Sequence, residues 1–186
     1  DIKPDLLKMW VEWNRTVKED GAMIFFATQP FASELILSNQ KNFRYDLIWY
    51  KALGTGFLNS KKMPMRNHEI ILVFYRKLPT YNPQMGAGLR KKGLRNNNRL
   101  NSNYGKFSET EKESYFDDGG KRYPQSVIDF TNGDRTTEND HPTQKPLDLI
   151  RYLVRTYSNE GDIVFDGYMG SATTAIACIE ENRIYC

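Results

Sequence analysis

Residues 164–177 read VFDGYMGSATTAIA, and they decide the fold because they join an apolar strand, a turn with two glycines and a helix of small residues. In an open α/β sheet, ligands bind beyond the carboxyl ends of the strands. Gly167 and Gly170 allow a ligand to approach the backbone closely, and Asp166 can accept a hydrogen bond from a ligand ammonium or hydroxyl group. The alternative is a tight strand-to-helix turn without a ligand. A phosphate-binding P-loop and a dinucleotide fingerprint are disfavoured, since no lysine follows the glycines and G-x-G-x-x-G spacing is absent.

Strand and helix patterns alternate along the rest of the chain. Short apolar runs bounded by turn residues predict strands at 22–27, 45–50, 69–75 and 162–165, with shorter ones within 122–130 and from 182 onward. Helical spacing of apolar residues predicts helices before Gly21 and at 31–39, 142–157 and 172–181. Continuous apolar strands are typical of sheets covered on both faces, so we predict a doubly wound, mostly parallel α/β sheet.

Charge is distributed unevenly in a chain whose total composition is ordinary for a globular protein. The 186 residues carry a formal net charge of only +3, and 39% of them are hydrophobic. Between residues 51 and 107, however, twelve lysines and arginines are opposed by Glu69 alone, which leaves −8 for the rest of the chain. A segregated positive field points to a polyanionic partner, because neutralising phosphates releases their counterions. A solvated basic loop is the alternative.

The same basic stretch contains a long segment without regular periodicity, rich in glycine, asparagine and proline from residue 76 to about residue 103. Such a run is too long for an ordinary connection inside a compact domain and is usually functional or disordered. We therefore predict an irregular basic insert, residues 77–136, between two parts of one α/β domain, residues 1–76 and 137–186.

Several classes of protein are disfavoured by composition. The apolar runs are far shorter than the roughly 20 residues that span a bilayer, and no signal peptide is recognisable, so we expect no membrane partner. Two cysteines near the C-terminus cannot form a disulfide framework, which favours a reducing, cytoplasmic location. No metal site is expected, because His68 and His141 are the only histidines and no cluster has ligand spacing.

A second motif, HPTQKP at residues 141–146, lies about twenty residues before the glycine-bearing turn. Alone it is an ordinary helix start, in which Thr143 and Gln144 can cap the helix or offer donors and acceptors near its N-terminus, and Lys145 adds a donor. Together with DGYMGSATTAIAC (166–178) and ENRIYC (181–186), it resembles the C-terminal half of DNA amino-methyltransferases. The order of motifs is that of their beta class. Residues 56–84 also resemble the region between catalytic motif and target-recognition insert in phage and prophage members.

The resemblance implies a Rossmann-like fold that uses S-adenosylmethionine as cofactor. It implies a site-specific DNA methyltransferase that methylates the exocyclic amine of adenine, with cytosine as the alternative target. The expected partner is double-stranded DNA with a flipped target base; a homodimer and a paired restriction enzyme are compatible with the resemblance. From the fold pattern alone, a nicotinamide-dependent oxidoreductase and a non-catalytic DNA-binding module remain as rivals.

The family's cofactor motifs can be matched to positions in this chain. The turn usually reads D-P-F-x-G-S-G-T-T, and here Gly167, Tyr168 and Ala172 replace the proline, the phenylalanine and the second glycine. Asp166 is expected near the methionine ammonium. The cofactor-binding residues implied by the match are Thr143, Gln144, Lys145, Pro146, Asp166, Gly167, Tyr168, Gly170, Ser171, Thr173 and Thr174.

The family's catalytic tetrapeptide, D-P-P-Y or S-P-P-Y, does not occur in the sequence. We expect it upstream of Asp1, and the acidic residue that holds the cofactor ribose a few positions after Tyr185. No catalytic residue is therefore assigned within the chain, which is expected to be a fragment that is inactive by itself.

Contacts with DNA are expected mainly from basic residues. Phosphate contacts outnumber base contacts, and they require only that a side chain is long enough to reach the DNA backbone. The candidates are Lys61, Lys62, Arg66, Arg90, Lys91, Lys92, Arg95 and Arg99. The asparagines at 96–98 can read adenine edges, although an asparagine run in a loop is more often turn chemistry. Trp10, Trp13 and Trp49 are expected in the core rather than stacked on bases.

Overall fold

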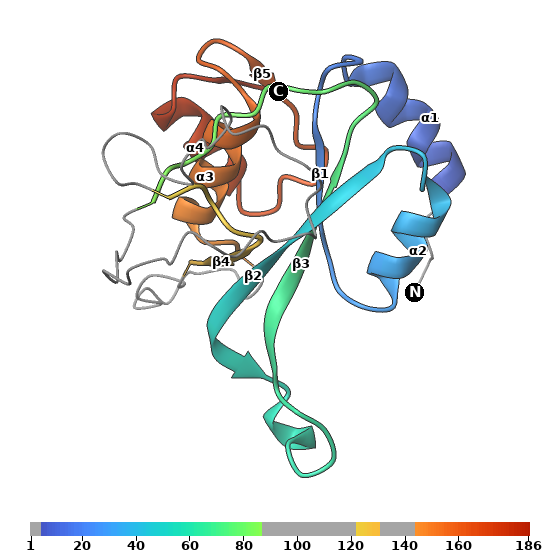
Figure 1. Cartoon of the computed structure of the whole chain (residues 1–186), viewed down its shortest axis with the longest axis vertical. Helices are drawn as coiled ribbons and strands as arrows, with labels where there is room; N and C mark the ends of the chain where they lie inside the picture. The colour runs from blue at the N-terminus through green and yellow to red at the C-terminus, as the bar shows by residue number, and fades with distance from the viewer. Residues whose placement is uncertain (1–4, 87–121, 131–143) are drawn as a thin grey trace, which may run out of the picture. The chain divides into compact units, whose positions relative to one another are not determined.

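The computed structural model describes residues 5–86, 122–130 and 144–186 (Figure 1). The chain divides into two compact units, a larger one of residues 1–82 and 125–186 and a smaller one of residues 83–124. Within the described part of the smaller unit, Gly86 and Arg122 form an antiparallel bridge. Across the described ranges, every helix is too short or too polar to cross a lipid bilayer.

Each predicted helix and strand is present, with shifts at its ends. The strands are β1 (Met23–Ala27), β2 (Phe43–Thr55), β3 (Arg66–Phe74), β4 (Val127–Asp129), β5 (Ile163–Val164) and β6 (Ile184–Tyr185). The helices are α1 (Leu6–Thr16), α2 (Phe31–Ser38), α3 (Leu147–Tyr157) and α4 (Thr173–Glu180), with a single 3-10 turn, η1 (Phe57–Asn59).

Two helix boundaries differ from the prediction. Helix α1 ends at Thr16 rather than near Gly21, because Val17 adopts an extended conformation, and adjacent β-branched residues favour a helix only weakly. Helix α3 begins at Leu147 rather than at residue 142. Pro146 occupies its N-cap position, and a proline disfavours helical conformation in the residue before it. No side chain caps α3, so Gln144 does not fill the first of its two predicted roles; the second, to offer a donor or acceptor near the helix start, stays a prediction. Thr143 lies outside the described residues.

The larger sheet has the strand order β1-β3-β2-β4. Strands β1 and β2 both pair antiparallel with β3, and β4 pairs parallel with β2. Three of these strands therefore share one direction and β3 runs against them. Strand β3 departs from the parallel arrangement because it follows β2 directly through a hairpin, whereas a parallel neighbour needs a crossover connection. Strands β5 and β6 form a separate parallel pair.

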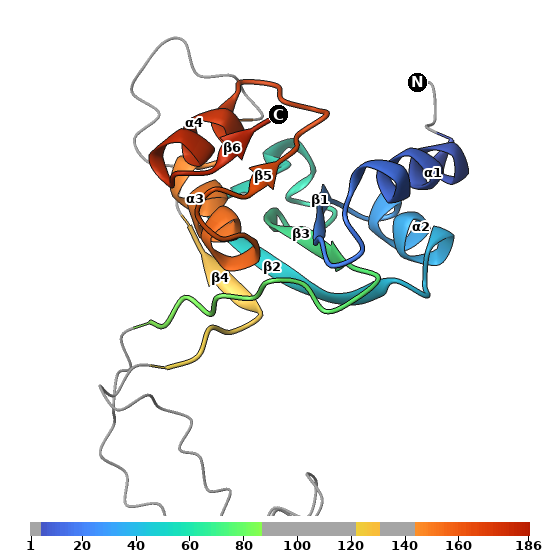
Figure 2. The same ribbon diagram turned by 90° about the horizontal axis from the view of Figure 1, so that it is seen from above.

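Helices cover both faces of the larger sheet, as a doubly wound arrangement requires (Figure 2). One face packs against α1 and α2 through a core of Trp10, Met23, Ala27, Ala32, Leu35, Leu72 and Phe74. The other packs against α3 through Leu47, Trp49, Ile71, Ile128, Leu149 and Leu153. Alternation along β3 sends Ile71 to one face and Leu72 to the other. Trp10 and Trp49 are buried as predicted, and Trp13 packs against the first core.

Candidate functional site

The turn between β5 and α4 is organised by Asp166. One carboxylate oxygen, Oδ1, accepts a hydrogen bond from the backbone N–H of Tyr168 at 2.9 Å, and Oδ2 accepts one from the hydroxyl of Thr174 at 2.6 Å. The carboxylate therefore ties the end of the strand to the first turn of the helix. Each carboxylate oxygen can accept a second hydrogen bond, so Asp166 can also bind a cationic ligand group.

Two residues of this turn adopt left-handed backbone conformation. Gly170 has φ +52°, and Ala172, at the N-cap of α4, has φ +60° and ψ +21°. This conformation costs an L-residue about 1–2 kcal/mol, whereas glycine adopts it without that cost. The backbone at Ala172 is thus one that a glycine would adopt without this cost. Tyr168, two residues after Asp166, is 73% exposed, so the turn is open to a ligand.

Helix α3 packs on α4, the helix that follows this turn. The segment 144–146 directly precedes α3 and is therefore held on the same side of the sheet as the turn's helix. Ile150 and Val154 form a core with Ala177 and Cys178, and Leu147 packs against it. Arg155 donates two hydrogen bonds to Glu181, at 2.5 and 2.6 Å. These bonds hold the pKa of the Glu181 carboxyl below its ordinary value.

Lys145 takes part in a charged cluster that joins three segments of the chain. Its Nζ donates to Glu69 Oε2 at 2.6 Å, and Lys51 donates to the other oxygen of the same carboxylate. We call Lys51, Glu69 and Lys145 the Glu69 cluster. Its ammonium groups lie over aromatic rings: Lys145 is 5.1 Å from the Phe26 centroid, and Lys51 is 4.7 Å from that of Trp49. The segment before α3 is therefore anchored to β1, β2 and β3.

The two lysines keep Glu69 ionised although its side chain is only 15% exposed. Burial raises the pKa of the Glu69 carboxyl, but hydrogen bonds from Lys145 and Lys51, with their positive charges, outweigh burial and hold it below its ordinary value. Two cations on one anion leave the cluster with a net positive charge. A cluster of this kind favours a nearby anion, such as a phosphate or a carboxylate.

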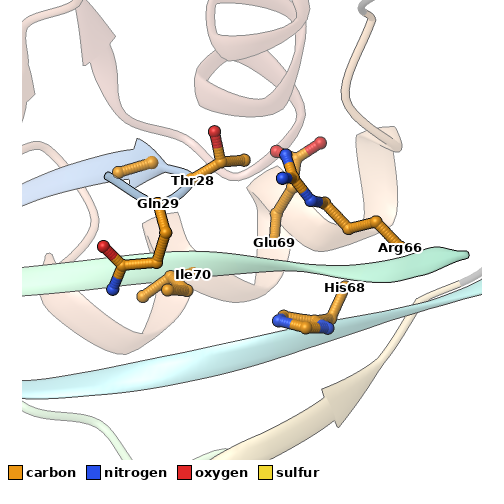
Figure 3. A pocket seen from close by; sticks show the side chains of 7 residues that line it. Thr28, Gln29, Arg66, His68, Glu69 and Ile70 are labelled. Carbon is orange, nitrogen blue, oxygen red and sulfur yellow. The ribbon is translucent and has the colours of Figure 1, made fainter. Parts of the chain in front are cut away.

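A small pocket lies beside the Glu69 cluster, just beyond the carboxyl end of β1 (Figure 3). Its lining residues are Ala27, Thr28, Gln29, Arg66, His68, Glu69 and Ile70. Figure 3 shows the side chains of His68 and Glu69 on opposite sides of β3. The pocket thus offers amide, hydroxyl and cationic groups at a strand end, where open α/β sheets bind ligands.

The predicted site residues fall into three groups. Gln144, Lys145 and Pro146 lie at the start of α3, and residues 166–174 lie on the neighbouring turn and helix. Lys61, Lys62 and Arg66 are exposed on the hairpin between β2 and β3. The remaining predicted residues, Thr143, Arg90, Lys91, Lys92, Arg95 and Arg99, lie outside the described residues.

Sequence reasoning did not assign a role to Lys51, to Glu69 or to the pocket residues Thr28 and Gln29. The usable signal was Glu69 itself, the single acidic residue among twelve basic ones. An isolated carboxylate in a basic stretch is a natural partner for lysines that the fold brings next to it. The sequence does not show which lysines these are, because Lys145 is separated from Glu69 by 76 residues.

Comparison with known families gives a match over almost the whole chain. The family model N6_N4_Mtase, described as DNA methylase, matches residues 4–186. Among curated proteins, the chain is 25% identical over 211 residues to the type II methyltransferase M.HindIII of Haemophilus influenzae, covering 97% of this chain and 64% of that protein. It is 28% identical over 186 residues to M1.MboII of Moraxella bovis, covering 89% of this chain and 65% of that protein. The chain thus spans less than two thirds of these relatives.

Solved structures of DNA methyltransferases share the fold. The complex of M1.HpyAVI with SAM superposes with a TM-score of 0.62 at 22% identity, over 98% of this chain and 74% of that one. The cytosine-N4-specific PvuII DNA methyltransferase superposes with a TM-score of 0.64 at 12% identity, over 96% and 64%. The predicted Rossmann-like methyltransferase fold is therefore confirmed.

Proposed function

Because the chain belongs to the N6_N4_Mtase family of DNA methylases, we propose that the protein containing it transfers a methyl group from S-adenosylmethionine to an exocyclic amino group in DNA. The observation that carries this proposal is the family match across residues 4–186, which includes the Asp166 turn. We assign adenine as the target, with cytosine as the alternative.

The cofactor site we propose combines the Asp166 turn with the start of α3. S-adenosylmethionine carries its methyl group on a positively charged sulfur and has an ammonium group in its methionine part. The side chains of the turn suit these groups. Asp166 can accept a hydrogen bond from the ammonium, Ser171 offers a hydroxyl, and the exposed Tyr168 offers an aromatic face. The full set is Thr143, Gln144, Lys145, Pro146, Asp166, Gly167, Tyr168, Gly170, Ser171, Thr173 and Thr174.

The target amine needs help from the protein, because its lone pair is delocalised into the base ring. Acceptors must stabilise the positive charge that develops on the amine, and the base must leave the duplex stack to reach them. We assign no residue of this chain to that step. The role we propose for the chain is to hold the cofactor and the DNA in alignment, which supplies a large part of the rate advantage in such reactions.

We assign DNA binding to the basic insert, residues 77–136, and to Lys61, Lys62 and Arg66 on the hairpin. Within the insert, Arg90, Lys91, Lys92, Arg95 and Arg99 are the proposed phosphate contacts. Replacing Lys91 and Lys92 with alanine should weaken DNA binding. It should also reduce the salt slope, the steepness with which the logarithm of the binding constant falls with the logarithm of salt concentration, by up to about two, because each lost phosphate contact removes about 0.9.

The decisive test is methyl transfer by the intact protein. DNA incubated with the protein and methyl-labelled S-adenosylmethionine should become labelled, and digestion to nucleosides should place the label on N6-methyladenine. Label on N4-methylcytosine would support the alternative target. Absence of transfer across varied DNA sequences, with DNA binding retained, would favour a non-catalytic DNA-binding module. Preferential equilibrium binding of NAD over S-adenosylmethionine would favour an oxidoreductase.

A further inference from the structure

The end of the β2–β3 hairpin exposes several large apolar side chains close together in the sequence. Phe57 and Leu58, at the start of η1, are 75% and 96% exposed, and Met63 nearby is 58% exposed. Figure 1 shows this end of the hairpin extending away from the helices of the same unit. We call residues 53–65 the hairpin tip. Adjacent, nearly fully exposed large apolar residues on a projecting turn are typical of a contact surface rather than of a folding core.

The hairpin tip holds a defined shape through its own backbone hydrogen bonds. The amide of Asn59 donates to Gly56 O at 2.9 Å, and the amides of Lys62 and Met63 donate to Asn59 O at 2.8 and 3.0 Å. Gly56 opens the turn with φ +93°, a conformation that favours glycine. At the base of the hairpin, Glu69 anchors Lys51 to Lys145. The apolar residues are therefore presented on an ordered turn, so binding costs little ordering entropy.

The charged residues at the hairpin tip and directly after it are all positive. Between residues 52 and 68 the sequence has Lys61, Lys62 and Arg66 and contains neither aspartate nor glutamate. Lys61, Lys62 and Arg66 are exposed. An apolar point flanked by cations fits DNA, in which stacked bases lie between two rows of phosphates. It fits a second copy of the same tip poorly, because contact between identical tips would bring like charges together.

On the premise that DNA is the substrate, as proposed above, we propose that the hairpin tip is a DNA wedge: Phe57 and Leu58 insert between base pairs while Lys61 and Lys62 bind the flanking phosphates. Apolar side chains inserted in this way partly unstack a base step and bend the duplex, at a cost of a few kcal/mol. Removing a base from the stack becomes easier where the neighbouring step is already open. The wedge would therefore assist target-base extrusion.

The test uses the intact protein with Phe57→Ala and Leu58→Ala combined, beside Lys61→Ala and Lys62→Ala combined. Leu37→Ala is the matched control, because Leu37 on α2 is 68% exposed and lies outside the hairpin. Affinity for duplex DNA is measured across salt concentrations. Unstacking is measured from the topoisomers of a plasmid relaxed in the presence of protein, which requires no knowledge of the recognised sequence.

The apolar variant should bind DNA roughly tenfold more weakly with an unchanged salt slope, since stacking contacts release no counterions, and it should lose the topoisomer shift. The lysine variant should lower the salt slope by up to about two units, and Leu37→Ala should match wild type. Unchanged DNA affinity in the apolar variant would overturn the wedge. If that variant also converted a dimer to a monomer, the hairpin tip would be a contact between two copies of the protein. If wild type methylates DNA while the apolar variant behaves identically, only the wedge fails; if wild type transfers no methyl group, the proposed function fails.

Discussion

The Asp166 turn and the Glu69 cluster are both organised by one carboxylate, Asp166 just after β5 and Glu69 within β3, yet they are assembled in opposite ways. In the turn, Asp166 bonds to groups two and eight residues further along the chain. In the cluster, Glu69 bonds to lysines 18 and 76 residues away. The side-chain bonds of the turn are thus local, although the backbone N–H of Asp166 also donates to Cys186 O at 3.1 Å. The cluster exists only when β2, β3 and the segment before α3 are packed together, so it reports on tertiary structure.

The largest effect should come from the local site. Replacing Asp166 with alanine removes two hydrogen bonds within the turn and the proposed acceptor for the cofactor ammonium. Bonds to charged groups contribute about 1.5–3 kcal/mol each, so S-adenosylmethionine binding should weaken roughly 10- to 100-fold. DNA affinity should change much less. Isothermal titration with each ligand measures both.

Asp46→Ala is the matched control for this prediction, because Asp46 is an exposed aspartate on β2. It should leave cofactor affinity unchanged. If Asp166→Ala weakens DNA binding more than cofactor binding, Asp166 does not hold the cofactor.

Glu69→Gln tests the long-range site through stability. The variant leaves two half-buried ammonium groups without their counterion, so the free energy of unfolding should fall by about 1–3 kcal/mol, measured by urea denaturation. Glu19→Gln is the control, because the pair between Glu19 and Lys77 is exposed and should contribute little. Adding Lys145→Met to Glu69→Gln should recover part of the loss. Equal effects of Glu69→Gln and Glu19→Gln would show that the cluster is not formed.

The stabilisation from Glu69 should depend on pH in a defined direction. Its folded pKa lies below the ordinary value of 4.5, so its contribution is present above that pH and is lost as the pH falls through the folded pKa. The difference in unfolding free energy between wild type and Glu69→Gln should therefore be constant from about pH 7 to pH 5 and shrink below it. A difference that grows on acidification would contradict the lowered pKa.

The smallest effect is expected from a substitution in the Asp166 turn. Replacing Ala172 with glycine removes the cost of a left-handed alanine, about 1–2 kcal/mol, and adds back a smaller entropic cost of glycine. Net stability should rise by up to about 1 kcal/mol, with S-adenosylmethionine affinity maintained or improved. Thermal unfolding with and without cofactor measures both. A fall in stability would mean that Ala172 is not left-handed in the folded protein.

The same contrast between local and long-range contacts explains which features could be predicted from the sequence. Within the described residues, apolar runs located the strands, helical spacing located α1 to α4, and the motif at residues 166–174 marked the turn, because these signals are local. The direction of β3 was missed because continuous apolar runs look alike in parallel and antiparallel strands. The Glu69 cluster was missed because charge segregation shows that Glu69 stands alone without showing which lysines reach it. The sequence marks Ala172 as a replacement for the glycine usual in the resembling motif, but it does not show that this alanine adopts a left-handed conformation.

Hydrogen exchange of the intact protein, with and without S-adenosylmethionine, tests most directly whether the turn and the segment anchored by the Glu69 cluster form one cofactor site. Binding should slow amide exchange in peptides covering residues 144–150 and 164–176 together, and leave residues 55–65 of the hairpin unchanged. Saturation with S-adenosylmethionine that leaves exchange at residues 164–176 unaltered would contradict the assignment of the cofactor to the Asp166 turn.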